Sequence, residues 1–387
     1  MTAKRASTVL KVFSDDCIGC GVCLNDCDLL NELGMTPGEI AAQVCTDQVD
    51  DRLLAAIQRC HLCGRCSTDC LVNLNPAHMM KAAREVLVRG GRVSPEDCDV
   101  MLVNRDWNFF TIYRETYNIH YDDLIADRCD TLFFPGCSLA AYSPELTRAA
   151  FEWLKGRGYR LGFSDMCCGK PLESIGLSDE ADCHLDRLRG QLDSTGARRL
   201  VTACPNCEAM LKQHLPEVEI LSIYALMWEA GIRISGTEKL TIHDSCPDRT
   251  NSRNPQAVRA LLAGYPQVEM ASHGENTICC GSGGIVSAID PDVCSAHAER
   301  RMAEFSASGA DMCVTNCMGC AYRLARPGQS GQVRHCLEYV FDIHVDYAQV
   351  ERNTHLMWEG SQGKTNLQRL ADAQTVPMER AEAGSYV

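Results

Sequence analysis

The chain carries the cysteine pattern Cys137, Cys167-Cys168-Gly169, Cys204-Pro-Asn-Cys207 and repeats it as Cys246, Cys279-Cys280-Gly281, Cys317-Met-Gly-Cys320. Each copy supplies five cysteines, whereas a four-iron cube is held by four thiolates. A chain that only conducts electrons has no need of the fifth thiolate. The excess therefore favours a protein that does chemistry on its clusters.

The repeat extends to residues that start helices. Ser143-Pro144 and Asn254-Pro255 each offer an N-cap residue followed by a proline at the first helical position. Ser178 and Asp290 lie at matching places after the cysteine pairs and are predicted to cap the next helix of each copy. From Thr131 onward, the sequence therefore consists of two related halves with a period of about 110 residues.

Each half is predicted to be a β-α-β-α-β-α unit. The β-rich runs 200–204 and 313–317 both deliver a CxxC pair to the start of a helix. Alternating strands and helices imply a parallel sheet covered by helices, with ligands at the carboxyl ends of the strands. This topology can bring the three cysteine groups of a half to one cluster, and Gly169 and Gly281 would let the backbone approach that cluster closely.

The N-terminal part contains two runs with the spacing C-x2-C-x2-C-x3-C. In such runs the first three cysteines bind one cluster and the fourth binds the other. One 4Fe–4S cluster is therefore assigned to Cys17, Cys20, Cys23 and Cys70, and the other to Cys60, Cys63, Cys66 and Cys27. Zinc is the alternative metal, but a zinc site closes with four ligands and has no use for the third cysteine of each run.

The sequence predicts a mixed α/β protein, α+β over the whole chain, in which a helical module precedes two tandem α/β domains with short parallel sheets, related by a pseudo-twofold axis. We expect a dicluster ferredoxin module at 1–95 with helices at 38–44 and 50–58, an aromatic-rich helical linker at 96–128, cysteine-rich domains at 129–235 and 236–346, and a polar tail at 347–387. The linker aromatics are expected to join the ferredoxin module to the rest. The tail is expected to be disordered or reserved for docking.

Composition limits the function classes. The 387 residues include 25 cysteines, too many for packing alone, and 45% hydrophobic residues, enough for at least one full core. The formal charge of −14 argues against nucleic acid as a partner. No apolar stretch approaches the ~20 residues of a membrane span, and no secretory signal is visible. A cytoplasmic protein is expected, with any membrane contact made through a partner subunit.

The doubled cysteine pattern resembles that of the CCG-domain family of iron–sulfur oxidoreductases. A ferredoxin module followed by two CCG domains is most similar to the D subunit of heterodisulfide reductase, and the order also resembles the iron–sulfur subunits of anaerobic glycerol-3-phosphate dehydrogenase and glycolate oxidase. The resemblance covers about residues 10–345. It implies a noncubane four-iron cluster on each five-cysteine set, with cubane clusters as the alternative. The first set is Cys137, Cys167, Cys168, Cys204 and Cys207, and the second set is Cys246, Cys279, Cys280, Cys317 and Cys320.

The same resemblance implies a mechanism in which these ten cysteines form the catalytic site. A disulfide would lie between the two clusters, each accepting one sulfur, while electrons arrive singly through the ferredoxin module. No G-x-G-x-x-G fingerprint for a flavin or nicotinamide is present, so electrons must come from a flavoprotein or a hydrogenase- or dehydrogenase-type partner.

Two other functions compete with this interpretation. The chain could relay electrons to quinone from a flavin dehydrogenase that oxidises glycerol 3-phosphate, glycolate or lactate. A metal-stabilised scaffold without redox function is a third, weaker hypothesis.

Few residues outside the cysteine motifs stand out. His243 lies at a predicted strand end before Cys246, where it could donate a proton or a hydrogen bond that tunes the cluster. Lys170 could balance cluster charge, hold a substrate carboxylate or sulfonate, or simply face solvent. The cysteines outside the motifs are predicted to be structural, with Cys45 buried and Cys313 either in the core or beside the second cluster: Cys45, Cys98, Cys129, Cys183, Cys294, Cys313 and Cys336.

Overall fold

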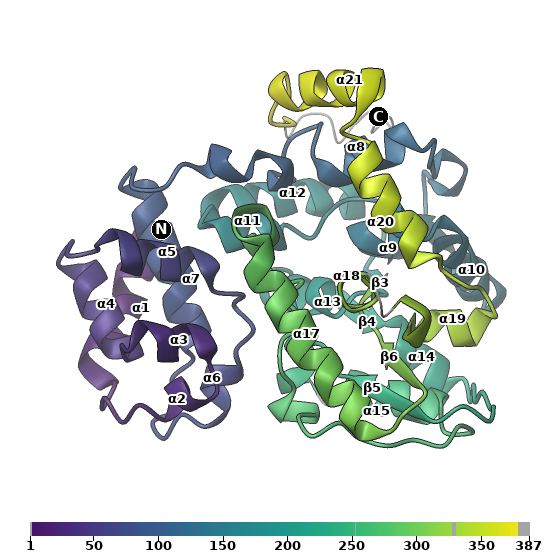
Figure 1. Cartoon of the computed structure of the whole chain (residues 1–387). Coiled ribbons are helices and arrows are strands. Elements are labelled where there is room, and N and C mark those ends of the chain that lie inside the picture. The colour runs from purple at the N-terminus through teal and green to yellow at the C-terminus, as the bar shows by residue number, and fades with distance from the viewer. Residues whose placement is uncertain (1, 252, 327–329, 378–387) are drawn as a thin grey trace.

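The computed structural model describes residues 2–251, 253–326 and 330–377. A helical N-terminal module stands beside a larger α/β part, and two C-terminal helices cover one end of that larger part (Figure 1). The predicted mixed α/β class, with short parallel sheets after a helical module, is confirmed. Within the described residues, no helix is long and apolar enough to cross a membrane.

The described residues of the N-terminal module form helices joined by the cysteine loops. The helices are α1 (Thr2–Asp16), α2 (Val22–Asn25), α3 (Asp28–Leu33), α4 (Pro37–Cys45), α5 (Asp51–Arg59), α6 (Arg65–Thr68) and α7 (Pro76–Arg89). The helices predicted at 38–44 and 50–58 are confirmed as α4 and α5. A capping box starts α4, because Thr36 Oγ1 accepts the Glu39 N–H at 3.4 Å while Glu39 Oε2 accepts the Thr36 N–H at 2.8 Å.

The first half of the α/β part contains a four-stranded parallel sheet with the strand order β2-β1-β3-β4. Its elements are β1 (Thr131–Phe134), α9 (Cys137–Tyr142), α10 (Pro144–Gly156), β2 (Leu161–Phe163), α11 (Lys170–Ile175), α12 (Ser178–Thr195), β3 (Arg199–Thr202), α13 (Pro205–His214), β4 (Glu219–Ser222) and α14 (Ile223–Glu229). Strands β1 and β3 are neighbours, and each leads into a helix that begins at a cysteine motif. Strand β4 adds a fourth strand to the three that were predicted.

The second half has a three-stranded parallel sheet with the order β5-β6-β7. Its elements are β5 (Leu240–His243), η3 (Cys246–Thr250), α15 (Arg253–Leu261), η4 (Gly274–Asn276), α16 (Val286–Ile289), α17 (Pro291–Ser308), β6 (Met312–Thr315), α18 (Met318–Leu324), η5 (Ser330–Gln332), β7 (Val333–His335) and α19 (Cys336–Phe341). No counterpart of β2 forms among the described residues, where Leu240 instead makes an isolated parallel bridge with Gln267. The predicted β-α-β-α-β-α order therefore holds only approximately in this half.

Two of the four predicted helix caps are present. Ser143 Oγ accepts the Leu146 N–H at the start of α10, and Asp290 Oδ1 accepts the Val293 N–H at the start of α17. The caps predicted at Ser178 and Asn254 are wrong. Ser178 is the first residue of α12 and donates its hydroxyl to Glu85 of the N-terminal module, and the Asn254 side chain is buried inside α15. Both side chains form hydrogen bonds with other parts of the fold, and therefore they do not cap their helices.

The linker and the C-terminal segment pack against each other, which corrects two predictions. Their elements are η1 (Pro95–Met101), α8 (Phe109–Thr116), η2 (Asp122–Leu124), α20 (Tyr347–Leu356) and α21 (Gly360–Ala371). The aromatic side chains of α8 contact Met357, Leu370 and Tyr142, so they join the C-terminal helices, not the N-terminal module, to the first half. Helices α20 and α21 contradict the first of the two alternatives predicted for the tail, disorder, whereas the second, a docking segment, stays a prediction. Residues 378–387 lie outside the described range.

The two halves share one apolar core that includes Phe133, Leu240 and Met312. At the centre of this core, the Tyr224 hydroxyl of α14 lies 2.9 Å from the Ala203 carbonyl oxygen and 2.8 Å from the Asn316 carbonyl oxygen. These carbonyls directly precede Cys204 and Cys317. Tyr224 therefore holds the two CxxC segments next to each other.

The N-terminal module is fixed to the first half through Arg84 of α7, which is fully buried. Its guanidinium donates to the carbonyl oxygens of Ile57 (2.9 Å), Gln58 (2.8 Å) and Cys60 (2.5 Å) in the module and to that of Ser174 (2.6 Å) in α11. A buried charge is costly unless its hydrogen bonds are satisfied. The three acceptors in the module hold the buried guanidinium in place, and its bond to the Ser174 carbonyl oxygen ties the module to α11.

Candidate functional site

The dicluster cysteines lie in two groups on loops around α2 and α6. Cys17, Cys20, Cys23 and Cys70 line one common cavity. The fourth cysteine of the first run, Cys27, lies close to Cys60, Cys63 and Cys66. The fold thus places the fourth cysteine of the first run with the first three of the second run, and the fourth cysteine of the second run with the first three of the first. These are the groups predicted from the sequence, and the assignment of the cysteines as cluster ligands stays a prediction.

Burial and neighbouring cysteines raise the pKa of thiols in both dicluster groups. Burial, with Cys60 nearby, raises the pKa of the Cys27 thiol to about 12. Burial and the neighbouring Cys17 raise the pKa of the Cys23 thiol to about 11. Cationic iron would stabilise the thiolates that burial disfavours. The sulfur-rich loops therefore fit iron–sulfur clusters.

The first set of cysteines converges from three strand ends. Cys137 opens α9 after β1, the Cys167-Cys168 pair follows β2, and Cys204 and Cys207 lie at the start of α13 after β3. Their thiols form a chain of hydrogen-bonding contacts in the order Cys137, Cys167, Cys168, Cys207, Cys204. All five are buried or half-buried.

The second set has the same arrangement in the second half. Its thiols contact one another in the order Cys246, Cys279, Cys280, Cys320, Cys317, with 3.0 Å between the Sγ atoms of Cys280 and Cys320. The Gly281 N–H also donates to Cys279 Sγ at 3.3 Å. Ten sulfur atoms that converge in two equivalent groups fit two clusters of similar type.

The glycines after the two cysteine pairs lie against the long helices α12 and α17. Gly281 has a φ of 81°, and a Cβ there would lie 2.3 Å from the Cys294 carbonyl oxygen of α17. Gly169 has a φ of 80°, and the atoms nearest to its Cβ position belong to Ala181 and His184 of α12. Gly281 therefore lets α17 pack closely under its cysteine loop, and both glycines have the left-handed backbone conformation that favours glycine. The predicted close approach of the backbone to a cluster at these glycines stays a prediction.

The second dicluster group and the two five-cysteine sets join into one continuous path. Cys63 of the dicluster group contacts Cys279 of the second set. Cys317 of the second set contacts Cys204 of the first set. The second set therefore lies between the dicluster module and the first set.

His243 is the last residue of β5 and is fully buried. Arg301 Nε donates to His243 Nδ1 at 2.9 Å, and because arginine only donates, the imidazole proton must lie on Nε2. Nε2 is buried without a partner among the described residues, and a ring nitrogen of His243 lies within 4.8 Å of the sulfurs of Cys280 and Cys320. His243 is thus placed to donate a hydrogen bond to sulfur of the second set. The corresponding residue of the first half, at the end of β1, is Phe134.

Lys170 is the first residue of α11 and directly follows the first cysteine pair and Gly169. Its Nζ lies 3.8 Å from Glu173 Oε2, and its side chain is 38% exposed. This placement is compatible with both the charge-balancing and the solvent-facing interpretation.

The cysteines outside the motifs are mostly buried. Cys98, Cys129, Cys294, Cys313 and Cys336 are buried, whereas Cys45 and Cys183 are exposed, so the buried position predicted for Cys45 is wrong. Cys45 is the last residue of α4 and faces solvent there. Cys313 lies in the core of β6, close to Cys280.

Sequence reasoning missed a pair of histidines below the cysteine loops. His184 of α12 contacts the Cys167 carbonyl oxygen through Nε2 at 2.8 Å. His297 of α17 packs on His61, with ring centroids 4.4 Å apart, and a group formed by His61, His297 and Cys279 places their ligand atoms within 4.8 Å. His184 and His297 lie 16 and 17 residues after the second cysteine of their pairs, and this near-match between the two copies was the available signal.

Known families and relatives agree with this layout. Residues 131–212 and 240–325 match the CCG cysteine-rich domain, and residues 14–74 match the 4Fe-4S dicluster domain. These matches place one 4Fe-4S dicluster domain before two CCG cysteine-rich domains.

Among its relatives is the D subunit of dihydromethanophenazine:CoB–CoM heterodisulfide reductase from Methanosarcina mazei, 24% identical over 88% of this chain and 95% of that protein. The same subunit from Methanosarcina barkeri is 23% identical over 83% of this chain and 91% of that protein. The B subunit of fumarate reductase (CoM/CoB) from Methanothermobacter marburgensis is 24% identical over 79% of this chain and 66% of that protein. The predicted resemblance to the D subunit of heterodisulfide reductase is thereby confirmed.

The crossed dicluster assignment predicts which double substitutions affect a single cluster. Cys27→Ser combined with Cys60→Ser should remove about four irons per chain and leave one cubane EPR signal, because both residues would serve one cluster. Cys27→Ser combined with Cys17→Ser should remove about eight irons and both signals. Iron analysis and EPR of anaerobically purified variants, with the exposed Cys45→Ser as control, measure this. The reverse pattern would show that each run holds its own cluster.

The hydrogen bond expected from His243 predicts an asymmetry between the two sets. His243→Phe places the residue of the first half in the second and should lower the reduction potential of the second-set cluster. The expected shift is roughly 40 mV, which corresponds to about 1 kcal/mol for one electron. EPR-monitored redox titration would measure it, with the exposed His120→Phe as control. An unchanged reduction potential would show that His243 donates no hydrogen bond to the sulfurs of the second set.

Proposed function

We propose that this chain is an iron–sulfur oxidoreductase subunit that receives electrons through the dicluster module and reduces a small-molecule disulfide at the two CCG sets. The observation that carries the proposal is the unbroken series of thiol contacts from Cys63 through both complete five-cysteine sets. A relay alone has no use for the fifth cysteine of each set. The relatives named as heterodisulfide reductase subunits support the same function.

The proposed cofactors are two cubane 4Fe–4S clusters in the dicluster module and two four-iron clusters on the CCG sets. Noncubane clusters are proposed for the CCG sets because five cysteines converge in each. When bound, the clusters would supply one-electron carriers and, at the CCG sets, iron that can bind a sulfur atom. Around them, the chain contributes the thiolates, the buried His243 and a core that excludes water.

The overall reaction is balanced by two electrons and two protons. The sulfur–sulfur bond of the substrate breaks, each sulfur gains one electron and one proton, and two thiols leave. The electrons come from a reduced flavoprotein or a hydrogenase- or dehydrogenase-type subunit, one at a time. No flavin or nicotinamide is proposed on this chain.

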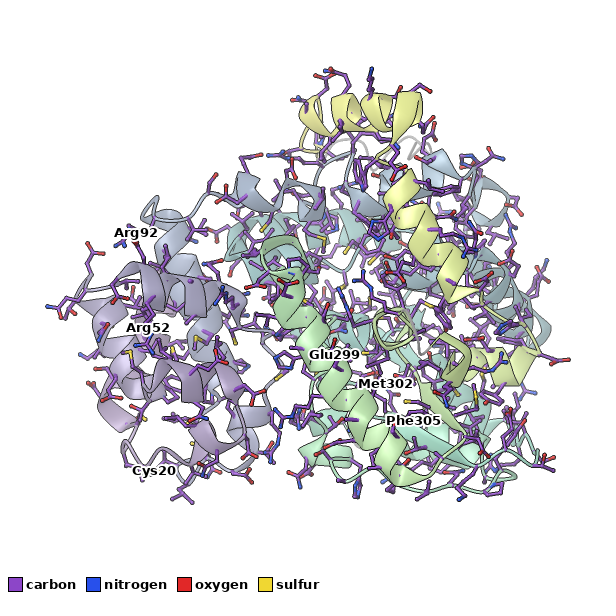
Figure 2. The ribbon with its side chains drawn as sticks, viewed as in Figure 1. Cys20, Arg52, Arg92, Glu299, Met302 and Phe305 are labelled. Carbon is purple, nitrogen blue, oxygen red and sulfur yellow. The ribbon has the colours of Figure 1, made fainter. Side chains whose placement is uncertain are left out.

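The donor would dock at the first dicluster group. Cys20 is exposed, and Figure 2 shows it at the lower end of the N-terminal module. Ile18 and Leu71, which flank the cysteines of this group, are 61% and 68% exposed, and Val72 beside them is also exposed. Exposed apolar side chains around a cluster are suited to a partner protein. We place the complex in the cytoplasm, with any contact to a membrane made by that partner.

An electron relay is the alternative function, and one observation favours it. A relative of similar identity is named as the B subunit of a fumarate reductase, so this arrangement of domains also occurs in a protein named for a different reaction. In a relay, electrons would pass from a flavin dehydrogenase through the same path to quinone, and no disulfide would be cleaved.

Turnover of the chain with its native partners distinguishes these functions. The reduced complex, offered a panel of disulfides and quinones, should release two thiols per disulfide and contain about 16 irons per chain. Cys168→Ser and Cys280→Ser should abolish disulfide turnover while the dicluster EPR signals remain, whereas Cys183→Ser on the surface should change neither. Quinone reduction without disulfide cleavage and with only cubane signals would contradict the proposal. Zinc in place of iron would exclude both redox functions.

A further inference from the structure

The two cysteine sets have the same order of thiol contacts but different charged surroundings. Among the described residues of the second half, three arginines in η3, α17 and α18 are at most 7% exposed: Arg249, Arg301 and Arg323. A buried cation is costly unless hydrogen-bond acceptors and an opposite charge surround it. The partners of these arginines therefore indicate what this part of the fold is built to hold.

Arg323 is the arginine whose charge is least compensated. It follows Cys320 by three residues, and its Nε and Nη1 are buried without a hydrogen-bond partner among the described residues. No carboxylate in the described part of the chain forms an ion pair with it, and Arg326 beside it is itself basic. Its guanidinium lies close to the thiols of Cys294 and Cys280. A buried cation with two unused N–H groups therefore lies next to the second set.

Arg249 is a second buried cation that has no carboxylate partner among the described residues. It follows Cys246 by three residues and donates to the backbone carbonyl oxygens of Glu275 and Thr277, the latter at 2.7 Å. Its Nε has no partner within the described ranges, and its charge acts on the thiol of Cys63 in the N-terminal module. Arg249 thus lies where the module meets the second set.

Arg301 differs from these two, because it has a carboxylate partner. Its Nη1 lies 2.5 Å from Glu304 Oε2, and its Nε donates to His243 at 2.9 Å. It belongs to α17, which runs along the side of the α/β part that faces the module (Figure 1). Glu304 balances the charge of Arg301, so the unbalanced charge comes from Arg249 and Arg323.

The first half has buried apolar residues at the corresponding positions. The correspondence is counted from the matched cysteines and, for α12 and α17, from Ala181 and Cys294, which lie against the loop glycines. The corresponding pairs are Arg249 and Ala140, Arg301 and Leu188, and Arg323 and Met210. At these positions, buried arginine charge is present in only one copy of the repeat.

The basic groups near the first set lie in more solvated places. Lys170 is 38% exposed, and its Nζ lies 3.8 Å from Glu173 Oε2. Arg187 is buried but lines a cavity of about 460 Å³ that borders Cys137 and Cys167. A cavity of this size admits water, and water weakens the effect of a charge on its neighbours. The first set therefore has weaker positive surroundings than the second.

A nearby cation changes how readily an iron–sulfur cluster accepts an electron. A cluster bound by thiolates carries net negative charge, and each electron that it gains adds to this charge. A buried cation beside it stabilises the reduced form and raises its reduction potential, because the protein interior screens charge poorly. Neither Arg249 nor Arg323 lines the cavity beside the first set, which favours an anion inside the fold as their partner.

We propose that Arg323, together with Arg249, compensates the charge of the second-set cluster and gives that cluster a higher reduction potential than the first-set cluster. The proposal rests on the proposed function, because it takes both sets to hold clusters that receive electrons. One electron leaves the reduced dicluster group and is gained by the second set, with no bond formed or broken. The second set thus stores the first of the two electrons that a two-electron reduction needs, until the partner supplies the next one.

Anaerobic redox titration of the full, cluster-loaded chain, monitored by EPR, tests the proposal. Loss of a signal in Cys168→Ser or in Cys280→Ser identifies the set to which it belongs. In the unaltered chain, the second set should be reduced at the higher potential. Arg323→Met introduces the first-half residue and should lower this potential by about 59 mV or more, a tenfold loss of electron affinity, while the first-set potential stays the same.

Two further variants separate charge from packing. Arg323→Lys keeps the charge and should retain most of the second-set potential, and Arg198→Met, at an arginine whose side chain is 78% exposed, is the matched control. The proposal is overturned by a first-set potential above that of the second set, by an unchanged potential in Arg323→Met, or by equal losses in the methionine and lysine variants. If Arg323→Met loses its iron, Arg249→Met and Arg249→Lys decide between the same outcomes.

The outcome also separates this proposal from the proposed function. The expected potentials without turnover of any disulfide would keep the role of Arg323 and refute the reductase function. Disulfide turnover with unshifted potentials in Arg323→Met would keep the function and refute the role of Arg323.

Discussion

The buried guanidinium of Arg84 fixes the geometry on which the proposed electron path depends. Three of its carbonyl acceptors come from the N-terminal module and the fourth, that of Ser174, from α11, so separating the two would leave the Ser174 carbonyl and one guanidinium nitrogen, Nη1, without their hydrogen bond. The thiol of Cys60 lies near enough to influence its charge electrostatically. Gly176 reinforces this joint, because a Cβ there would come within 2.8 Å of the Arg84 backbone. Held in this position, the module brings Cys63 against Cys279.

A second constraint joins the two halves of the α/β part. The Tyr224 hydroxyl contacts the backbone just before Cys204 and just before Cys317, and the shared apolar core keeps the two sheets together. Duplication thus produced two equivalent sulfur sets, and the N-terminal module made them unequal by covering one. The other set borders a cavity. His243, with Phe134 as its counterpart, adds a chemical difference to this positional one.

The sequence predicted the features that depend on local spacing. Both cysteine runs, both CCG patterns, α4 and α5 could be placed because each is defined by residues close together in the chain. Features that depend on packing between distant segments could not. The contact between Cys63 and Cys279, the burial of Arg84 and the use of Ser178 as a partner for Glu85 all require the docked module. The aromatic linker was recognised as a joint, but its partner, helices α20 and α21, was expected to be a polar tail that is disordered or reserved for docking.

The central claim is that electrons pass from the N-terminal module to the second set and from there to the first set. Freeze-quench EPR after flash photoreduction tests it in two variants, one without the second-set cluster through Cys246→Ser and Cys280→Ser and one without the first-set cluster through Cys137→Ser and Cys168→Ser. Loss of the second-set cluster should slow reduction of the first set strongly, whereas loss of the first-set cluster should leave reduction of the second set unchanged. Fast reduction of the first set in the absence of the second-set cluster would contradict the account.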